Sequence, residues 1–142
     1  MRIDTRYFGE VDITEEKIIH FEKGLFGFEE YKDYTILYDI ESKEEPFFSW
    51  LQSTTEKTLA FPIVNPFKID ENYNPVIDES LLATMGECDE EDYLVYLLAT
   101  VPKEVKDASV NMKAPLIINT RNCQAIQAIA ENEGYEIKHK IL

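Results

Sequence analysis

Side chains suited to catalysis and metal binding are scarce in this sequence. Its 142 residues include two histidines, two cysteines and one tryptophan. Cys88 and Cys123 have neither CxxC spacing nor a neighbouring histidine, so we expect free, dispensable thiols and no metal or redox site. His20 lies in a strand-like run, where a surface or half-buried position is expected, and His139 lies in a charged tail. Neither position predicts a catalytic base.

Positive charge is also scarce, because 14 Lys and Arg stand against 28 Asp and Glu, for a formal net charge of −14. Nucleic-acid affinity comes mainly from cationic side chains that displace condensed counterions, and no basic stripe is present. Direct binding of RNA or DNA is therefore not expected. The acidity is explained by solubility, or by attraction to a basic partner and exclusion of nucleic acid from a shared complex.

A long apolar run is missing as well. The longest near-continuous one, residues 93–101, is about half as long as a membrane-spanning helix requires. The N-terminal residues alternate in the manner of a strand and do not combine positive charge with an apolar run. We expect a cytoplasmic protein without a membrane segment, folded as a single domain over residues 1–142.

Motifs that bind phosphates or metals are not found. Gly24 and Gly27 stand three apart, but neither GxxxxGK[ST] nor GxGxxG surrounds them, so we predict turn glycines, at least one with a positive φ. Carboxylate pairs are inevitable at this composition and do not by themselves indicate an acid–base dyad. Asn65 and Pro66 follow an apolar run and predict a turn that ends a strand. No cofactor, no metal and no enzymatic activity are expected.

Most segments show the alternation of apolar and polar residues that is typical of β-strands. The predicted strands are residues 3–7, 11–13, 17–21, 34–38, 47–51, 59–64, 93–101 and 116–119. The first two are expected to form a hairpin, and residues 93–101, which are apolar on both faces, a central strand. Short strands separated by turn signals favour a barrel or a sandwich.

Two segments have helical character. Asp78 can cap residues 79–85, and Gly86 marks a stop, so about two turns of helix are predicted there. Residues 122–134 contain Gln and Ala with flanking Asn and Gly, which favours a helix, but residues 125–129 also alternate as in a strand. Residue patterns leave this second segment open.

Aromatic residues gather around the predicted turns and strand ends. They are Phe26, Phe28, Phe47, Phe48, Trp50, Phe61 and Phe67. Most of them are expected in the core, and any that are exposed would serve as anchors in a protein–protein interface.

Several of these stretches, in this order and spacing, resemble the FliW family of flagellar assembly factors. They are residues 19–28 (IHFEKGLFGF), 48–53 (FSWLQS), 60–67 (AFPIVNPF), 93–102 (YLVYLLATVP), 110–119 (VNMKAPLIIN) and 123–129 (CQAIQAI). The resemblance spans nearly the whole chain. It implies a mainly β fold, a compact antiparallel β-barrel-like domain with one or two short helices, in which residues 123–129 form a strand.

The resemblance also implies two protein partners and no cofactor or catalysis. These are flagellin before its export and the RNA-binding translational regulator CsrA, which represses the flagellin message. Binding of one competes with binding of the other, so exported flagellin frees the factor to restrain CsrA. By itself the protein is expected to be monomeric.

Candidate partner-binding residues are aromatic or acidic and fall in predicted loops or at element ends. They are Phe26, Phe28, Phe67, Glu44, Glu45, Glu71, Glu90, Glu91 and Asp92. Candidate structural residues of the family motifs are Gly24, Gly27, Asn65, Pro66, Pro115 and Asn119. Two other hypotheses stay open: a small hydrolase or isomerase that uses two carboxylates as acid and base, and an acidic mimic of nucleic acid that fills a basic groove. The second requires regularly spaced carboxylates, whereas the acidic clusters here are irregular.

Overall fold

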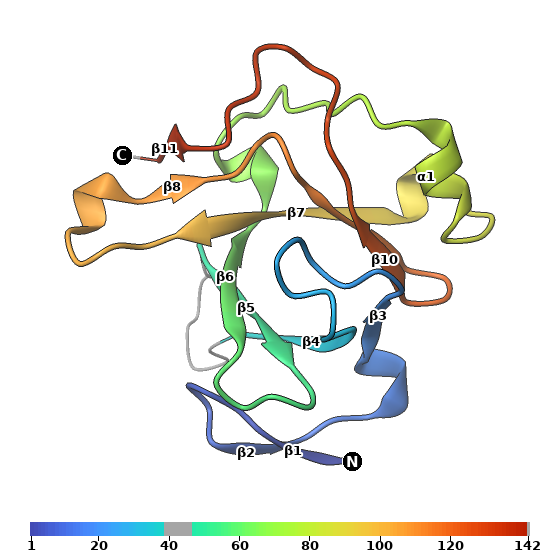
Figure 1. Cartoon of the computed structure of the whole chain (residues 1–142), viewed down its shortest axis with the longest axis vertical. Helices are drawn as coiled ribbons and strands as arrows, with labels where there is room; N and C mark the ends of the chain where they lie inside the picture. The colour runs from blue at the N-terminus through green and yellow to red at the C-terminus, as the bar shows by residue number, and fades with distance from the viewer. Residues whose placement is uncertain (39–46, 142) are drawn as a thin grey trace.

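A closed barrel of seven strands forms the centre of the computed structural model, which describes residues 1–38 and 47–141 (Figure 1). In order around the barrel the strands are β3 (Ile19–Phe21), β4 (Asp33–Leu37), β5 (Ser49–Ser53), β6 (Ala60–Val64), β7 (Tyr93–Thr100), β9 (Leu116–Asn119) and β10 (Gln124–Gln127). β7 pairs with both β6 and β9, and β10 pairs with both β9 and β3, which closes the ring. The expected mainly β, barrel-like fold is confirmed.

One pairing in the barrel is parallel. β10 runs parallel to β3, with Gln124 opposite His20, and the other six pairings between described barrel strands are antiparallel. A ring with an odd number of strands cannot alternate direction at every step, so at least one pair has to be parallel. The expected antiparallel barrel therefore holds everywhere except at this closure.

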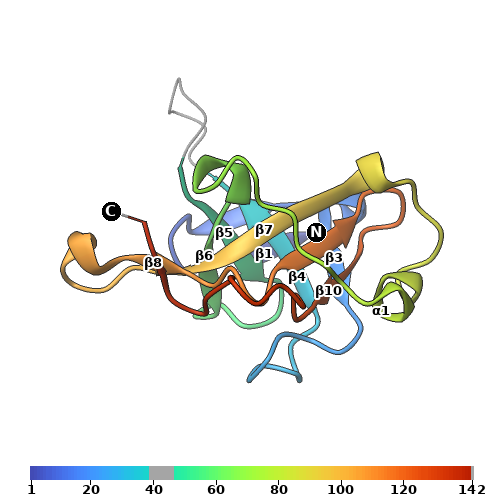
Figure 2. The ribbon, with the colours of Figure 1, turned by 90° about the horizontal axis from the view of Figure 1, so that it is seen from above.

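The barrel interior is filled by alternate side chains of its strands, as the two-residue period of a strand requires. Phe21, Tyr34, Leu51 and Ile63 are almost completely buried there. The loop of residues 22–32, which joins β3 to β4, adds the buried Leu25 to the same cluster. In Figure 1 this loop lies across the middle of the ring, and in Figure 2 it projects from one end of the barrel.

The remaining strands lie outside the ring. β1 (Arg2–Asp4) and β2 (Glu10–Asp12) form the predicted N-terminal hairpin. β8 (Ser109–Val110) extends the pairing of β7 beyond β9, and β11 (His139–Lys140) pairs with β8. These last two strands were not predicted, because two-residue strands are too short to show alternation.

The helices are short, as expected. α1 (Glu79–Ala83) begins at Asp78, whose carboxylate accepts a hydrogen bond from the Ser80 backbone N–H at 2.8 Å. Single 3₁₀ turns are η1 (Glu15–Lys17), η2 (Pro66–Lys68), η3 (Glu90–Asp92) and η4 (Val105–Asp107). Within the described ranges, no helix is long and apolar enough to cross a membrane.

The segment that residue patterns left open is a strand. Four antiparallel pairs with β9 and two parallel pairs with β3 hold β10 on both sides, so tertiary pairing outweighs the helical propensity of its Gln and Ala residues. The strand over residues 123–129 that the family resemblance implied is confirmed at Gln124–Gln127.

The motif glycines lie in the loop between β3 and β4. Gly24 has φ of +67° and Gly27 has φ of +86°, which confirms the predicted positive φ. Glycine adopts this left-handed region without the steric cost that a Cβ brings. Gly24 also lies against the backbone of Glu29, where a Cβ would come within 2.6 Å of the Cα. The turn therefore requires glycine at position 24 for two separate reasons.

Candidate functional site

The histidine with the most polar contacts is a link between strands. Nδ1 of His20 lies 2.7 Å from the Asp33 carboxylate, and Nε2 lies 2.9 Å from that of Glu22. These hydrogen bonds, the one to Asp33 first, raise the pKa of His20 above its ordinary value. Because both ring nitrogens are occupied by carboxylates, the imidazole has no nitrogen left to activate a nucleophile. His20 is half-buried, which is one of the two positions predicted for it.

The two cysteines and the described carboxylates are the other side chains that catalysis or metal binding could use. Cys88 and Cys123 are free thiols, as predicted, and burial is the first cause of a raised pKa at Cys88, which keeps that thiol protonated. No group of three or more His, Cys, Asp or Glu side chains in residues 1–38 and 47–141 is arranged to hold a metal ion.

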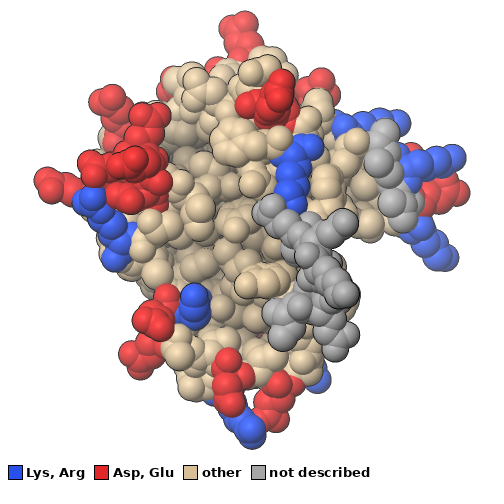
Figure 3. Space-filling model, turned by 180° about the vertical axis from the view of Figure 1, so that it is seen from behind, with Lys and Arg blue, Asp and Glu red and all other residues tan. Residues whose placement is uncertain are grey.

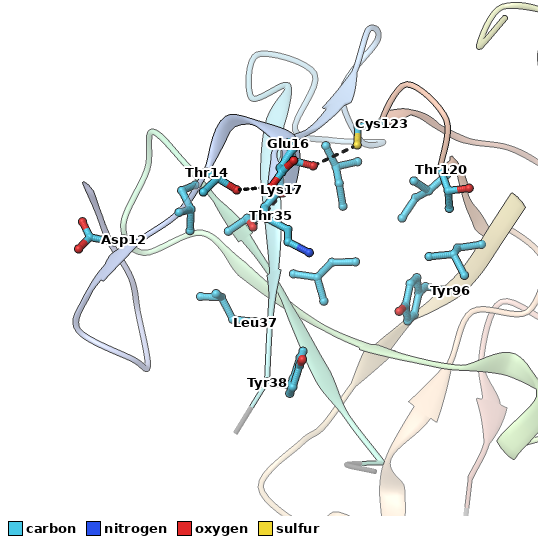
Figure 4. A pocket seen from close by; sticks show the side chains of 15 residues that line it. Asp12, Thr14, Glu16, Lys17, Thr35, Leu37, Tyr38, Tyr96, Thr120 and Cys123 are labelled. Carbon is cyan, nitrogen blue, oxygen red and sulfur yellow. Dashed lines mark hydrogen bonds between the residues drawn. The ribbon is translucent and has the colours of Figure 1, made fainter. Parts of the chain in front are cut away.

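One end of the barrel opens into a cavity of about 630 Å³, which we call the mouth cavity. This end is opposite the loop of residues 22–32, which joins the end of β3 to the start of β4. Ile19, at the start of β3, and Leu37, at the end of β4, therefore lie at the mouth. There the inward-facing Ile36, Leu94 and Tyr96 line the cavity with apolar surface. Figure 4 shows the labelled side chains arranged around one open space.

Polar groups at the mouth cavity are mostly held by the protein itself. The Thr35 hydroxyl donates to the Lys17 carbonyl at 3.0 Å, and the Thr120 hydroxyl donates to the Asp92 carbonyl at 2.6 Å. The Cys123 thiol lies 3.4 Å from the Glu16 carbonyl. Since these donors are already satisfied, the cavity presents its aliphatic and aromatic surface to a ligand.

A second hollow of about 720 Å³, the outer groove, lies on the outside of the barrel. Its floor is formed by the outward-facing Tyr93 and Val95 of β7 and by Ile117 of β9, and its wall by the segment of residues 65–82. Leu94 also lines it, and is thus shared with the mouth cavity. The two hollows meet at this side chain.

Local hydrogen bonds fix the wall of the outer groove. The Asn65 side chain accepts from the Phe67 N–H at 3.0 Å and Pro66 begins η2, so this turn holds Phe67 in an exposed position. Farther along, the Val76 N–H donates to the Asn132 side chain at 2.7 Å, and the Val76 carbonyl accepts from the Glu131 N–H at 2.8 Å. The wall is therefore held by a local turn at its start and by the segment that follows β10 farther along.

The buried Asn119 holds the end of α1 against the turn between β9 and β10. Its side-chain amide donates to the Met85 carbonyl at 3.1 Å, and its side-chain oxygen accepts from the Arg121 N–H at 2.9 Å. At the start of β9, the buried Pro115 presents its carbonyl to the Ala128 N–H at 3.1 Å. Both residues thus take part in hydrogen bonds that join separate segments of backbone.

Charge is concentrated at the margin of the hollowed face. Figure 3 shows a face whose hollowed middle carries little charge, with Asp and Glu side chains around its edge and Lys and Arg side chains among them. The described charged residues that line the two hollows are Asp12, Glu16, Lys17, Glu79 and Glu90. Four of these five are acidic, so the margin is net negative.

The residues proposed for partner binding do not all lie together in the structure. Phe67 and Glu90 line the outer groove, and the exposed Glu71 and Glu91 line neither hollow. Asp92 is half-buried, with its carboxylate 2.9 Å from Nε of Arg121.

The remaining candidates lie elsewhere. Phe26 and Phe28 are exposed on the loop between β3 and β4, at the other end of the barrel from the mouth cavity. Glu44 and Glu45 fall outside the described residues. Phe26 and Phe28 therefore do not share one surface with Phe67.

Three exposed apolar residues of this face were not among the sequence candidates. Tyr38 is 53% exposed, Val76 50% and Leu94 46%, and each lines at least one hollow. Leu94 lies in the apolar run of residues 93–101, which was predicted as a central strand. No signal in that run distinguishes a side chain at the open end of a barrel from one in the core.

Known proteins similar to this chain are flagellar assembly factors. The family model described as "FliW protein" matches residues 2–141. A protein named flagellar assembly factor FliW from Lachnoclostridium phytofermentans is 43% identical over 141 residues, which cover 99% of this chain and 90% of that protein. Another of the same name, from Lachnospira eligens, is 39% identical over 142 residues, covering 99% and 94% of the two chains.

A solved structure agrees with these sequence matches. The crystal structure of the flagellar assembly factor FliW superposes with a TM-score of 0.89 at 31% identity, and the match covers 100% of this chain and 97% of that one. The barrel, its loops and the two hollows thus belong to a chain that matches known flagellar assembly factors from end to end. The chain is a member of the FliW family.

Proposed function

We propose that this flagellar assembly factor binds flagellin and the translational regulator CsrA in the cytoplasm, and that the two partners compete for it. When flagellin is exported, the freed factor binds CsrA and relieves repression of flagellin translation. When flagellin accumulates, it occupies the factor, and CsrA silences the message. In this proposal the chain is a single-domain, monomeric binding protein and not an enzyme.

The observation that carries the proposal is the hollowed, weakly charged face with an acidic margin. Exposed apolar side chains gathered over a cavity are typical of sites that bind other proteins. Four exposed large apolar side chains, those of Tyr38, Phe67, Val76 and Leu94, line the two hollows. The acidic margin suits a basic, RNA-binding partner, because opposite potentials favour association.

Titration calorimetry with purified flagellin and purified CsrA tests the partner switch. We expect each protein to bind the wild-type chain, and saturation with flagellin to weaken the apparent affinity for CsrA in proportion to the flagellin present. Undiminished CsrA binding in the presence of saturating flagellin would contradict competition. Absence of binding to both partners would contradict the function as a whole.

The negative charge has a further role in the proposal, which is to repel RNA from CsrA. Glu71, Glu87 and Glu91 are exposed and line neither hollow, so changing all three to Gln removes charge and leaves the proposed contact surface unchanged. We expect this variant to bind CsrA within about threefold of wild type but to release less RNA from it, with each substitution costing at most about 0.5 kcal/mol of stability.

Two controls accompany the RNA-release measurement. The wild-type effect should weaken as added salt shortens the Debye length below about 10 Å. The isolated chain should not shift the flagellin leader RNA in a gel at physiological salt. Equal RNA release by the variant and the wild type at low and high salt would assign the antagonism to shape or conformational change instead.

A further inference from the structure

The two hollows have the dimensions and lining of a binding groove. Their volumes, about 630 and 720 Å³, each lie within the range of roughly 300–1,000 Å³ that is typical of ligand sites. Leu94 is 46% exposed and lines both hollows, so a ligand that fills both has to pass over this side chain. The minimal ligand therefore carries two apolar groups, one on each side of Leu94.

The charged groups at the margin restrict the chemistry of that ligand. Asp12 and Glu16 line the mouth cavity beside Lys17, and Glu79 and Glu90 line the outer groove. Among the described lining residues each hollow is net negative, but the Asp12 carboxylate also lies 3.2 Å from Nε of Arg2, so the larger negative excess is at the outer groove. Cationic groups next to the apolar groups of a ligand would be attracted most strongly there, whereas carboxylates or phosphates would be repelled.

This charge pattern argues against three other occupants. A second copy of the chain also carries a formal net charge of −14, so two copies repel each other at this margin. Nucleic acid is repelled for the same reason. A fatty acid would bring an anionic carboxylate, for which Lys17 is the one described cation among the lining residues, and Asp12 and Glu16 oppose it.

We propose that the mouth cavity and the outer groove form one docking groove for a protein segment with apolar side chains on one face and Lys or Arg on its flanks, seated across Leu94. This inference rests on the proposed function and assigns the partner-binding surface that it requires. Apolar side chains on either side of Leu94 supply the affinity, and the acidic margin selects basic flanks. The exposed Phe26 and Phe28, at the other end of the barrel, are not part of this groove.

A pair of model peptides tests the chemistry. One consists of Leu and Lys, with Leu at helical spacing on one face, and the other has Glu in place of every Lys. We expect the fluorescently labelled Lys peptide to bind at least about tenfold more tightly than the Glu peptide in low salt, and the difference to shrink as salt screens the margin. Equal binding, or tighter binding of the Glu peptide, would overturn the proposal.

Matched variants test the location. Leu94→Asp places a charge where the hollows meet, and Phe67→Ser removes an apolar side chain from the outer groove. Ile129→Asp is the control, because Ile129 is 50% exposed and lines neither hollow. We expect the first two to raise the Kd of the Lys peptide about tenfold or more and the control to leave it within about twofold.

Amide chemical shifts recorded during the titration provide a readout that does not depend on the variants. The largest changes are expected at residues lining the two hollows in the wild-type chain. Changes centred on the loop of residues 22–32, or equal losses for Leu94→Asp and Ile129→Asp, would refute the location. Thermal unfolding of each variant identifies any loss that comes from misfolding, and Phe67→Ser still decides the question if Leu94→Asp does not fold.

The same variants separate this inference from the proposed function. If wild type binds flagellin and CsrA, and Leu94→Asp binds both as tightly, the partners dock elsewhere and the groove assignment is wrong while the function stands. If wild type binds neither partner, the function fails, and the peptide measurements alone decide whether the groove binds basic amphipathic segments.

Discussion

Two glycines of one loop allow backbone strain and steric overlap to be measured separately. Gly24 and Gly27 both have positive φ, +67° and +86°. A Cβ on Gly24 would lie 2.6, 2.8 and 2.9 Å from the Cα, O and C atoms of Glu29, whereas a Cβ on Gly27 would meet no atom within 4 Å. Alanine at position 27 therefore adds only the cost of the left-handed backbone, and alanine at position 24 adds an overlap with backbone as well.

The expected losses follow from these distances. The left-handed conformation costs a non-glycine residue about 1–2 kcal/mol, which is the whole expected loss for Gly27→Ala. Carbon atoms pack at about 3.5–4.0 Å, so Gly24→Ala requires the backbone at Glu29 to move by about 1 Å, in a loop that buries Leu25 in the barrel. Such overpacking adds about 1–3 kcal/mol, for a total of about 2–5 kcal/mol.

Urea and thermal unfolding measure both losses. The single tryptophan, Trp50, lies in β5 with its ring centroid 4.3 Å from that of Tyr7, so its fluorescence reports on unfolding of the barrel. For a chain of this length, 1 kcal/mol corresponds to a melting shift of about 2–4 °C. We expect the loss for Gly24→Ala to exceed that for Gly27→Ala by at least about 1 kcal/mol. Equal losses would refute the argument from overlap with Glu29.

Three further predictions concern the barrel and its thiols. Asp33 and Glu22 raise the pKa of His20 above 6.5, so protonated His20 stabilises the fold below pH about 6.5, and this contribution disappears as pH rises through the folded pKa. The difference in unfolding free energy between wild type and His20→Gln should therefore fall as pH rises from about 6.5 through the folded pKa. A difference that does not change with pH would contradict this linkage. The Tyr34 hydroxyl is buried without a hydrogen-bond partner among the described residues, and burial raises its pKa to about 12. Denaturant unfolding of Tyr34→Phe should therefore show a stability that is unchanged or higher by about 1 kcal/mol. A clear loss of stability would mean that the hydroxyl makes a hydrogen bond. The double variant Cys88→Ser and Cys123→Ser should fold like wild type, since both thiols are free and no disulfide is lost. Circular dichroism and thermal unfolding check this, and failure to fold would show that a thiol is required.

Local patterns were enough to place most elements of this protein. Alternation located the hairpin and most barrel strands, and Asp78 located α1, because strand period and helix capping depend on residues close in the chain. Composition and spacing were also enough to predict free thiols and positive φ at a motif glycine, both of which the structure confirms. Family resemblance, carried by motifs along nearly the whole chain, identified β10 as a strand where propensity favoured a helix.

Only the tertiary structure decided how the barrel closes and which side chains its open end exposes. The β7–β9 and parallel β3–β10 pairings join segments far apart in the chain, so no local pattern encodes them. Leu94 has the sequence surroundings of a core residue and becomes an exposed lining residue because the ring ends beside it. Phe67 lies on that face, whereas Phe26, also a phenylalanine, lies at the other end of the barrel. The direction of the strands in the closed ring determines the end at which each loop lies, and residue type does not.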